Sequence, residues 1–273
     1  MSSDEDQLPK YLYKYADWGN EYHQWLLSAT AVYFASPRRF NDPFDSSVLP
    51  NFGLRTDEEW RTGCKTVEER KNPSLGEEEV DKQAEKNFRE RMWEDPDNIR
   101  NAYENAYKDV CKRFGIFCLS KTKGNLLLWS HYADQHRGFC IGYDRRALQS
   151  SLHLSNPAVG LCKVNYATHY PSLHPDKLSN EEQGLQTLTT KFVDWQYEQE
   201  YRFILVRQPG RDDPREYPID RRALHSVILG LGMSDEHKQQ IKEVLRQQLR
   251  HVRLFQARKS LYEFGLEFEP VEY

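Results

Sequence analysis

Two glutamates and an arginine occupy alternate positions near residue 200. Glu198, Glu200 and Arg202 lie in the aromatic and aliphatic segment 195–206, whose residue types favour a β-strand. Because the side chains of a strand alternate between its faces, the three charged groups share one face. A carboxylate pair beside a cation can stabilise positive charge on a sugar ring or activate a water molecule. That is the chemistry that cleaves an N-glycosidic bond.

The roles within this trio follow from their charges. Two like charges on one strand face raise the pKa of at least one carboxyl group, whereas Arg202 lowers it. We assign Glu200 as the central catalytic carboxylate, with Glu198 or Asp42 as the second, and Arg202 as a substrate-binding residue. The alternative interpretation is a ladder of ion pairs on a solvated strand.

A proline-containing loop at residues 36–45 brings further polar side chains together. Its sequence is Ser-Pro-Arg-Arg-Phe-Asn-Asp-Pro-Phe-Asp, in which the two prolines disfavour regular structure. Asn41, Asp42 and Asp45 surround Pro43, as expected of a rigid loop that carries binding groups. Alternatively, such side chains accept hydrogen bonds from their own backbone in a turn. We assign Asn41 and Asp45 to substrate binding and Asp42 to catalysis.

A short helix with the sequence Leu-Leu-Leu-Trp-Ser-His-Tyr delivers aromatic and imidazole groups at its end. His131 and Tyr132 are candidates for contacts to a ligand, such as the edge of a base. Trp129 and Trp195 are candidates for stacking on a base, and core packing is the alternative for both. The spacing of His131 and His136 matches neither HxxxH nor HExxH, so no metal site is predicted.

Apolar periodicity and turn residues outline the scaffold that must position these groups. Strands are expected at 11–15, 32–35, 114–120, 139–143, 161–166, 195–206, 226–230, 252–255 and 264–268. Helices are expected around Trp25–Leu27 and at 126–132, 180–194 and 234–249, with two or three more between 57 and 112. This pattern predicts an α+β fold with a mixed, mainly antiparallel sheet and flanking helices. Residues 1–273 are expected to form a single domain with a helical insertion at about 57–112.

The net charge of −4 hides a segregation along the chain. Between Tyr201 and Ser260, 13 basic residues outnumber 7 acidic ones, which leaves +6 there and −10 elsewhere. On the helix expected at 234–249, basic side chains recur every four residues, a spacing that suits contacts to nucleic-acid phosphates. These residues are Lys238, Lys242, Arg246 and Arg250. DNA is the predicted partner, and a solvated helix face is the alternative.

The composition, with 38% hydrophobic and 29% charged residues, is that of an ordinary globular protein. No apolar run reaches the roughly 18 residues that span a bilayer, and the acidic N-terminus does not resemble a secretory signal. We therefore expect a cytoplasmic protein with no membrane partner. The five cysteines form no CxxC pair, which favours reduced, buried thiols over a disulfide framework or a zinc site.

Three separated motifs together resemble one bacterial family. They are Phe-Asn-Asp-Pro-Phe-Asp at 40–45, Leu-Trp-Ser-His-Tyr-Ala at 128–133 with the following His136-x-Gly138, and Trp-x-Tyr-Glu-x-Glu-Tyr-Arg at 195–202. In this order they resemble the family known as domain of unknown function 2971, from about Lys10 to the C-terminus. Such genes resemble the accessory and anti-phage cargo of bacterial genomes, which implies a role in defence against phage.

A fainter resemblance is to the ADP-ribosyltransferase fold. In that fold an early strand carries His or Arg, a second strand carries Ser or Tyr, and a late strand presents a catalytic Glu in a Glu-x-Glu pair. The corresponding positions here are Lys14 or Tyr15, Ser36, and Glu198 with Glu200. Lys or Tyr departs from the pattern at the first position, and the chain contains no GxGxxG or GxxxxGK loop. This resemblance implies NAD as a substrate and Ser36 as one of the residues that bind it.

These observations predict a bacterial anti-phage defence enzyme that acts on an N-glycosidic bond without a cofactor. The first hypothesis is a DNA glycosylase that flips a modified base of phage DNA into an aromatic pocket and excises it. The second is an ADP-ribosyltransferase or NAD-consuming toxin, and the third is a non-enzymatic recognition module. Both enzymatic hypotheses require Glu200, Asp42 and His131 to converge in one concave pocket.

Overall fold

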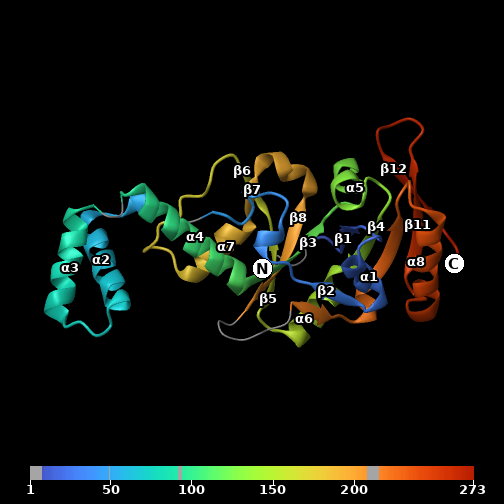
Figure 1. The fold of residues 1–273 in the computed structure, drawn as a ribbon. Helices are drawn as coiled ribbons and strands as arrows, with labels where there is room; N and C mark the ends of the chain where they lie inside the picture. The colour runs from blue at the N-terminus through green and yellow to red at the C-terminus, as the bar shows by residue number, and fades with distance from the viewer. Residues whose placement is uncertain (1–7, 49, 92–93, 208–214) are drawn as a thin grey trace, which may run out of the picture.

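The centre of the molecule is an eight-stranded sheet (Figure 1). The computed structural model describes residues 8–48, 50–91, 94–207 and 215–273. The strands of the sheet are β1 (Tyr11–Ala16), β3 (Phe114–Ser120), β4 (Phe139–Asp144), β5 (Val159–Lys163), β8 (Glu200–Val206), β10 (Leu224–Leu229), β11 (Arg253–Lys259) and β12 (Leu266–Pro270). Their order is β12-β11-β10-β4-β1-β3-β8-β5, and every neighbouring pair is antiparallel except β10 with β11. The predicted α+β fold with a mixed, mainly antiparallel sheet is confirmed.

Helices cover both faces of the sheet. One face carries α1 (Glu21–Ser28), α6 (Arg145–Ser155) and α8 (Asp235–Gln248). Leu27, Leu148 and Ile241 from these helices are buried in one cluster with Leu12 of β1 and Phe203 of β8. The apolar spacing of each helix therefore buries one stripe against the strands and leaves the polar side in water.

The other face carries α5 (Leu126–Tyr132) and α7 (Asn180–Thr189). Trp129 of α5 packs on Tyr15 of β1, and Leu188 of α7 packs on Ile204 of β8. Because β8 alternates, its charged residues point to this second face while Phe203 points to the first. The functional side chains of β8 thus lie under α5 and α7.

The strands β1 and β3 diverge near the middle of the sheet. Along the described residues of these two strands, the register pairs only Tyr13 with Ser120. Further along β3, Ile116 exchanges two backbone hydrogen bonds with Ala35, at 2.8 and 2.9 Å, instead of pairing with β1. The two strands therefore leave room between these pairings for a cavity at the centre of the sheet.

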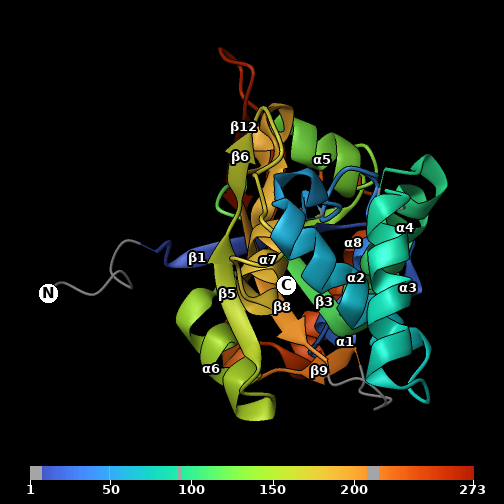
Figure 2. The same cartoon turned by 90° about the vertical axis from the view of Figure 1, so that its left-hand side faces the viewer.

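Two short sheets border the main one. One pairs β2 (Ala31–Tyr33) with β9 (Glu216–Pro218), and the other pairs β6 (Asn165–Ala167) with β7 (Thr190–Phe192). Figure 1 shows the second pair next to β8, and Figure 2 shows β6 continuing from the end of β5. The second pair holds a lysine of the site described below.

The predicted insertion consists of α2 (Asp57–Lys71), α3 (Glu77–Arg89) and α4 (Pro96–Arg113). Figure 1 shows α2 and α3 as a hairpin that projects from one end of the molecule and is joined to the sheet by α4. Thr56 and Glu59 form a capping box that starts α2. Asp95 caps α4 just before its first-turn proline. Local capping signals therefore mark where α2 and α4 begin.

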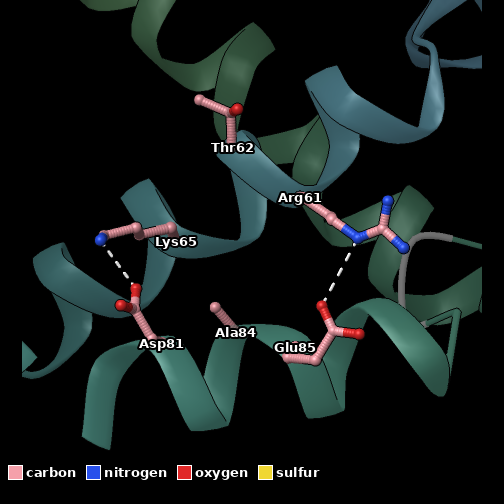
Figure 3. Close-up of a pocket in the computed structure, with 6 residues that line it drawn as sticks. All are labelled: Arg61, Thr62, Lys65, Asp81, Ala84 and Glu85. Carbon is pink, nitrogen blue, oxygen red and sulfur yellow. Dashed lines mark ion pairs between the residues drawn. The ribbon is translucent and has the colours of Figure 1, made fainter. Parts of the chain in front are cut away.

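A groove of about 410 Å³ lies between α2 and α3 (Figure 3). Lys65 pairs with Asp81 across it at 2.7 Å, and Arg61 pairs with Glu85 at 3.5 Å. All four side chains are more than one-third exposed. The charges of this groove already compensate each other in contact with water, so it is a solvated helix–helix seam.

Three predicted elements differ from the structure. The strand expected at 195–206 begins at Glu200, because residues Val193–Glu198 form a 3₁₀ helix and Gln199 has a left-handed backbone with φ of 45°. The helix expected at 180–194 ends at Thr189 and continues as β7. The strand expected at 161–166 is divided between β5 and β6.

Other differences are smaller. The helix α6 was not predicted, although Asp144 accepts a hydrogen bond at its start and Leu148 and Leu152 lie one turn apart. The strand expected at 264–268 is shifted to 266–270. The acidic N-terminal residues 1–6 lie outside the described residues.

Candidate functional site

Five charged side chains are buried together on the second face of the sheet. Glu200 and Arg202 come from β8, Glu198 from the 3₁₀ helix before it, Lys191 from β7, and Asp45 from the loop after β2. Arg202 is fully buried, and the other four are at most 6% exposed. Burying a charge is costly unless it is paired and hydrogen-bonded. We call these five residues the charged cluster.

Arg202 is the most completely bound member of the charged cluster. Its guanidinium donates to both oxygens of Asp45, at 2.9 and 2.6 Å, and to both oxygens of Glu200, at 2.9 and 3.0 Å. It also donates to the carbonyl of Leu188 at 2.7 Å and to the hydroxyl of Ser46 at 3.2 Å. Two bidentate pairs of this kind fix position as well as charge. Arg202 therefore joins β8, α7 and the loop at residues 36–48, which follows β2 and which we call the 36–48 loop.

Glu200 is held as a permanent anion. Burial alone would raise its pKa, but Arg202 and Lys191 outweigh burial and lower the pKa to about 2. Lys191 donates to the Glu200 carboxylate at 3.2 Å. The backbone N–H of Glu200 donates to the hydroxyl of Tyr166 at 2.9 Å. A carboxylate bound this firmly is poorly suited to exchanging protons near neutral pH.

Lys191 connects the three carboxylates. Its ammonium lies 2.6 Å from Glu198, 3.2 Å from Glu200 and 3.3 Å from Asp45. Burial would lower the pKa of Lys191, but the three carboxylates raise it above its ordinary value. With three acids and two bases, the cluster carries one net negative charge when every group is ionised.

Glu198 differs from Glu200 in its electrostatics. Its Oε1 accepts a hydrogen bond from the hydroxyl of Tyr132 at 2.7 Å, and its Oε2 accepts one from Lys191. Burial raises the pKa of Glu198, Lys191 opposes that effect, and the nearby charge of Glu200 adds to it. Burial and the Glu198 charge also raise the pKa of Tyr132. Glu198 is thus the carboxyl group of the cluster whose pKa is raised, toward neutral pH.

The backbone around Glu198 is fixed by side chains of neighbouring elements. The hydroxyl of Ser120 on β3 donates to the carbonyl of Glu198 at 2.6 Å. The side-chain amide of Asn125 donates to the carbonyl of Tyr197 at 3.0 Å. Together with the left-handed Gln199, these contacts aim Glu198 at the same space as Glu200 although it is not part of the strand.

The cluster borders a cavity of about 390 Å³, which we call the central cavity. The cavity lies where β1 and β3 diverge, and both Glu198 and Glu200 line it. Its other lining groups include aromatic rings and two cations, namely Tyr13, Tyr15, Tyr33, Phe40, His131, Tyr132, Lys14 and Arg39. This volume suits a nucleoside-sized ligand.

The convergence expected from the sequence is found in part. Glu200 and His131 line the central cavity with Glu198, Asn41, Asp45 and Tyr132. Asp42 does not line it: its carboxylate accepts a hydrogen bond from the backbone of Phe44 at 2.9 Å and borders a neighbouring cavity. The turn interpretation therefore holds for Asp42, because a short Asx side chain next to Pro43 reaches its own backbone first.

Two other predicted binding residues have structural contacts. Trp129 is fully buried, donates to the carbonyl of Lys123 and packs edge-on against Tyr15, so no face is open to a ligand. Its assignment to substrate stacking was wrong, and core packing is its role. Ser36 donates to the carbonyl of Cys111 and lies outside the lining of the central cavity.

Arg202 was assigned to substrate binding, but its complete burial leaves no guanidinium surface for a ligand. That assignment is corrected to positioning Asp45 and Glu200. Trp195 is partly exposed and lines the neighbouring cavity, with its ring 6.5 Å from that of His131.

The predicted phosphate-binding stripe lies on α8. Lys238 pairs with Asp235 at 2.9 Å, and Arg246 pairs with Glu243 at 3.6 Å. Helix α8 covers the face of the sheet opposite to the charged cluster. The stripe, Lys238, Lys242, Arg246 and Arg250, therefore forms no continuous surface with the central cavity.

Lys191 is the functional residue that the sequence reasoning missed. It was placed inside a predicted helix, where a lysine normally faces water. One signal was available: three acidic side chains and a single arginine cannot be buried together without another cation. The partner could not be located, because β7 and β6 pair only through tertiary structure.

The remaining reactive groups do not form a second centre within the described residues. All five cysteines are free, and burial raises the pKa of Cys118 at the central cavity, so it is a thiol there. Glu59, His174 and Asp176 approach one another closely enough for a metal ion. Asp176 is already bound by Arg55 at 2.6 and 2.7 Å, and Glu59 caps α2. The described helices include none that is long and apolar enough to cross a membrane.

One comparison with known proteins gives a match. Residues 128–203 match the family model described as "Protein of unknown function (DUF2971)". Searches of curated proteins and of solved structures gave no match. The resemblance to domain of unknown function 2971 is confirmed over residues 128–203, which hold the second and third motifs but not the motif at 40–45. The resemblance to ADP-ribosyltransferases is not shown. The matched segment runs from α5 to β8 and contains Tyr132 and four of the five members of the charged cluster. Residues 128–203, which build most of the candidate site, are therefore similar to the domain of unknown function 2971 family.

Proposed function

We propose that the protein is an anti-phage enzyme that hydrolyses an N-glycosidic bond, with Glu198 as its general base and a modified base of phage DNA as the leaving group. The observation that carries the proposal is the environment of Glu198. This buried carboxyl group has a raised pKa, is oriented by Tyr132 and Lys191, and lines an aromatic cavity of nucleoside size. Perturbed carboxyl groups in clefts are frequent at catalytic sites.

Glu198 is the group suited to activating water. In the proposed reaction, the oxygen of a water molecule bonds to C1′ of the sugar while the C1′–N bond breaks. The water proton passes to Glu198, and the base leaves with the electrons of the C1′–N bond and takes up a proton from bulk water, to which Glu198 then returns the proton that it accepted. A general base works best when its pKa lies close to the operating pH, which favours Glu198 over Glu200.

The rest of the charged cluster supports this reaction through its field. Positive charge develops on the sugar ring as the C1′–N bond breaks. With Glu200 and Asp45 held ionised beside Arg202, the cluster is net negative when Glu198 is ionised too. This negative charge, present until Glu198 takes the water proton, stabilises the positive charge that develops on the sugar, and Arg202 holds Glu200 and Asp45 in place without reorganisation.

The cavity walls suit a nucleotide. Tyr33, Phe40 and Tyr132 offer ring faces or edges to a base, and His131 lies at the exposed end of α5. Arg39 is an exposed cation on the cavity wall, where it can contact a phosphate. A base flipped out of a duplex would enter such a pocket at an unpairing cost of a few kcal/mol.

The test is release of free base from DNA of phages with modified bases and of phages with ordinary bases, followed by chromatography. We expect wild-type protein to release a base, and Glu198→Gln to slow release by roughly 10²- to 10⁴-fold. Glu243→Gln is the matched control, because this exposed residue lies on α8 at the opposite face of the sheet. It should leave the rate unchanged.

The same preparations separate the other hypotheses. Release of nicotinamide from NAD, with no base released from any DNA, would replace the proposal with the ADP-ribosyltransferase or NAD-consuming hypothesis. Tight binding of DNA with no product from either substrate would indicate a recognition module. In phage-challenge assays, protection that survives Glu198→Gln would contradict a catalytic role for Glu198.

A further inference from the structure

A second cavity, of about 500 Å³, lies beside the central one. We call it the aromatic cavity. It is formed by the 36–48 loop, the segment after β6, β7 and the 3₁₀ helix before β8. Its lining residues are Asp42, Phe44, Ala167, Thr168, His169, Tyr170, Thr190, Lys191, Phe192 and Trp195.

The aromatic rings of this cavity are unusually open to water. Phe44 is 65% exposed, Tyr170 is 58% exposed and Phe192 is 46% exposed. Trp195 is also partly exposed. Single exposed apolar side chains are normal, but several large rings gathered around one concave site mark a place where a ligand or partner binds.

The polar groups of the aromatic cavity are already engaged inside the protein. Asp42 accepts from the backbone of Phe44, and Lys191 is bound by the carboxylates of the charged cluster. The Thr168 hydroxyl and the His169 ring lie 2.9 Å apart in a hydrogen bond. Because the rings predominate and both charged groups are hydrogen-bonded within the protein, the site favours a flat, uncharged ring over a phosphate or carboxylate.

The aromatic and central cavities share a wall. Lys191 lines both of them. The ring of Trp195, in the aromatic cavity, lies 4.9 Å from the ammonium of Lys191 and 6.5 Å from the ring of His131, which lines the central cavity. A ligand long enough to pass Lys191 would therefore occupy both sites at once.

We propose that the aromatic cavity binds a second nucleobase by stacking, joined through its phosphate linkage to the nucleotide in the central cavity. This inference rests on the proposed function, because it takes the occupant of the central cavity to be a nucleotide. The second base comes from the neighbouring nucleotide of a DNA strand or from the other half of a dinucleotide. Stacking on aromatic side chains recognises both, since every base has a π face.

The test compares binding of three probes to the full-length protein. The probes are a fluorescein-labelled single-stranded oligodeoxynucleotide, NAD and thymidine monophosphate. The variants are Phe44→Ala and Tyr170→Ala, both exposed positions where truncation removes little buried surface. The matched control is Tyr262→Ala, which is 93% exposed on the loop between β11 and β12 at the other edge of the sheet.

We expect Phe44→Ala and Tyr170→Ala each to weaken the binding of the oligonucleotide, of NAD or of both by roughly 5- to 100-fold. The affinity for thymidine monophosphate should not change, and Tyr262→Ala should bind every probe as wild type does. A loss confined to the oligonucleotide identifies a DNA strand as the source of the second base. A loss confined to NAD identifies a dinucleotide. Equal affinities of wild type and both cavity variants for both probes, or no binding of any probe by wild type, would overturn the proposal.

This outcome is independent of catalysis. Binding that weakens as expected in a protein that releases no base would leave the second site standing and reject the glycosylase proposal. If both cavity variants release base with the rate and substrate affinity of wild type, the glycosylase proposal stands and the second site is rejected.

Discussion

The two ends of the charged cluster use the same kinds of side chain for different purposes. At one end, Arg202 binds Glu200 and Asp45 through four hydrogen bonds and is fully buried. At the other end, Glu198 is bound by one hydroxyl and one ammonium, and its pKa is shifted the other way. Glu198 and Glu200 are two residues apart, yet the pKa of Glu200 is lowered and that of Glu198 is raised.

The difference comes from the number and kind of partners. Glu200 faces a rigid guanidinium fork that matches both of its oxygens, which stabilises the ionised form strongly enough to overcome burial. Glu198 shares the single ammonium of Lys191 with two other carboxylates, so its own burial is compensated less completely. Position in the sequence motif alone does not distinguish these environments.

The largest expected effect is on folding, at the Arg202 end. Replacing Arg202 with Ala leaves Glu200 and Asp45 buried with only Lys191 to compensate them, and removing one partner of a buried ion pair costs about 3–5 kcal/mol. We expect urea denaturation to show a loss of that size in the free energy of unfolding. Glu198→Gln should change it by about 1 kcal/mol or less, because the amide still accepts from Tyr132 and Lys191 keeps two carboxylates.

Equal losses of stability in Arg202→Ala and Glu198→Gln would break the distinction between the two ends. Arg202→Lys sharpens the same test. A lysine keeps the charge but not the two bidentate contacts, so its stability should lie between those of wild type and Arg202→Ala.

The next effect is a pair of opposite pH dependences. The folded pKa of Glu200 is lowered from 4.5 to about 2, so its contribution to stability is present above pH 4.5 and is lost as the pH falls toward 2. That loss is on the order of 3 kcal/mol. The pKa of Glu198 is raised, so its contribution is present below pH 4.5 and is lost as the pH rises through the folded pKa.

Unfolding measured between pH 2.5 and 8 in wild type, Glu198→Gln and Glu200→Gln separates the two contributions. The stability of wild type relative to Glu200→Gln should rise with pH up to about 4.5. Its stability relative to Glu198→Gln should fall with pH above about 4.5. Two differences with the same sign of slope would show that both carboxyl groups belong to one environment.

The sequence predicts one part of this site through strand alternation. Glu200 and Arg202 were placed on one face of the strand, and the structure confirms this, with Tyr201 and Phe203 buried in the core on the other face of β8. Alternation also placed Glu198 with Glu200, but the left-handed Gln199 interrupts the strand and a 3₁₀ helix delivers Glu198 instead. The side chain reaches the expected region by a different backbone path.

Other features depend on contacts that no local pattern encodes. The ion pair between Asp45 and Arg202 spans 157 residues, and Lys191 reaches the cluster only because β6 and β7 pair. The divergence of β1 and β3, which makes the central cavity, follows from Ala35 taking the place of β1 beside Ile116. Deciding between Glu198 and Glu200 as the catalytic carboxylate therefore requires the hydrogen-bond partners of each carboxyl group, which the sequence does not show.

The smallest expected effect concerns Asp42, the third carboxylate assigned to catalysis. Its oxygen accepts from the backbone N–H of Phe44, and an asparagine can accept the same hydrogen bond with the same side-chain length. We expect Asp42→Asn to change the free energy of unfolding by about 0.5 kcal/mol or less, because the buried side chain keeps its size and its hydrogen bond to the Phe44 N–H. Base release should stay within about twofold of wild type, since no charge of the central cavity is altered. A large loss of activity with unchanged stability would place Asp42 among the reacting groups. The contrast between Glu200 and Glu198 would then be incomplete, because a third carboxylate would take part in the reaction.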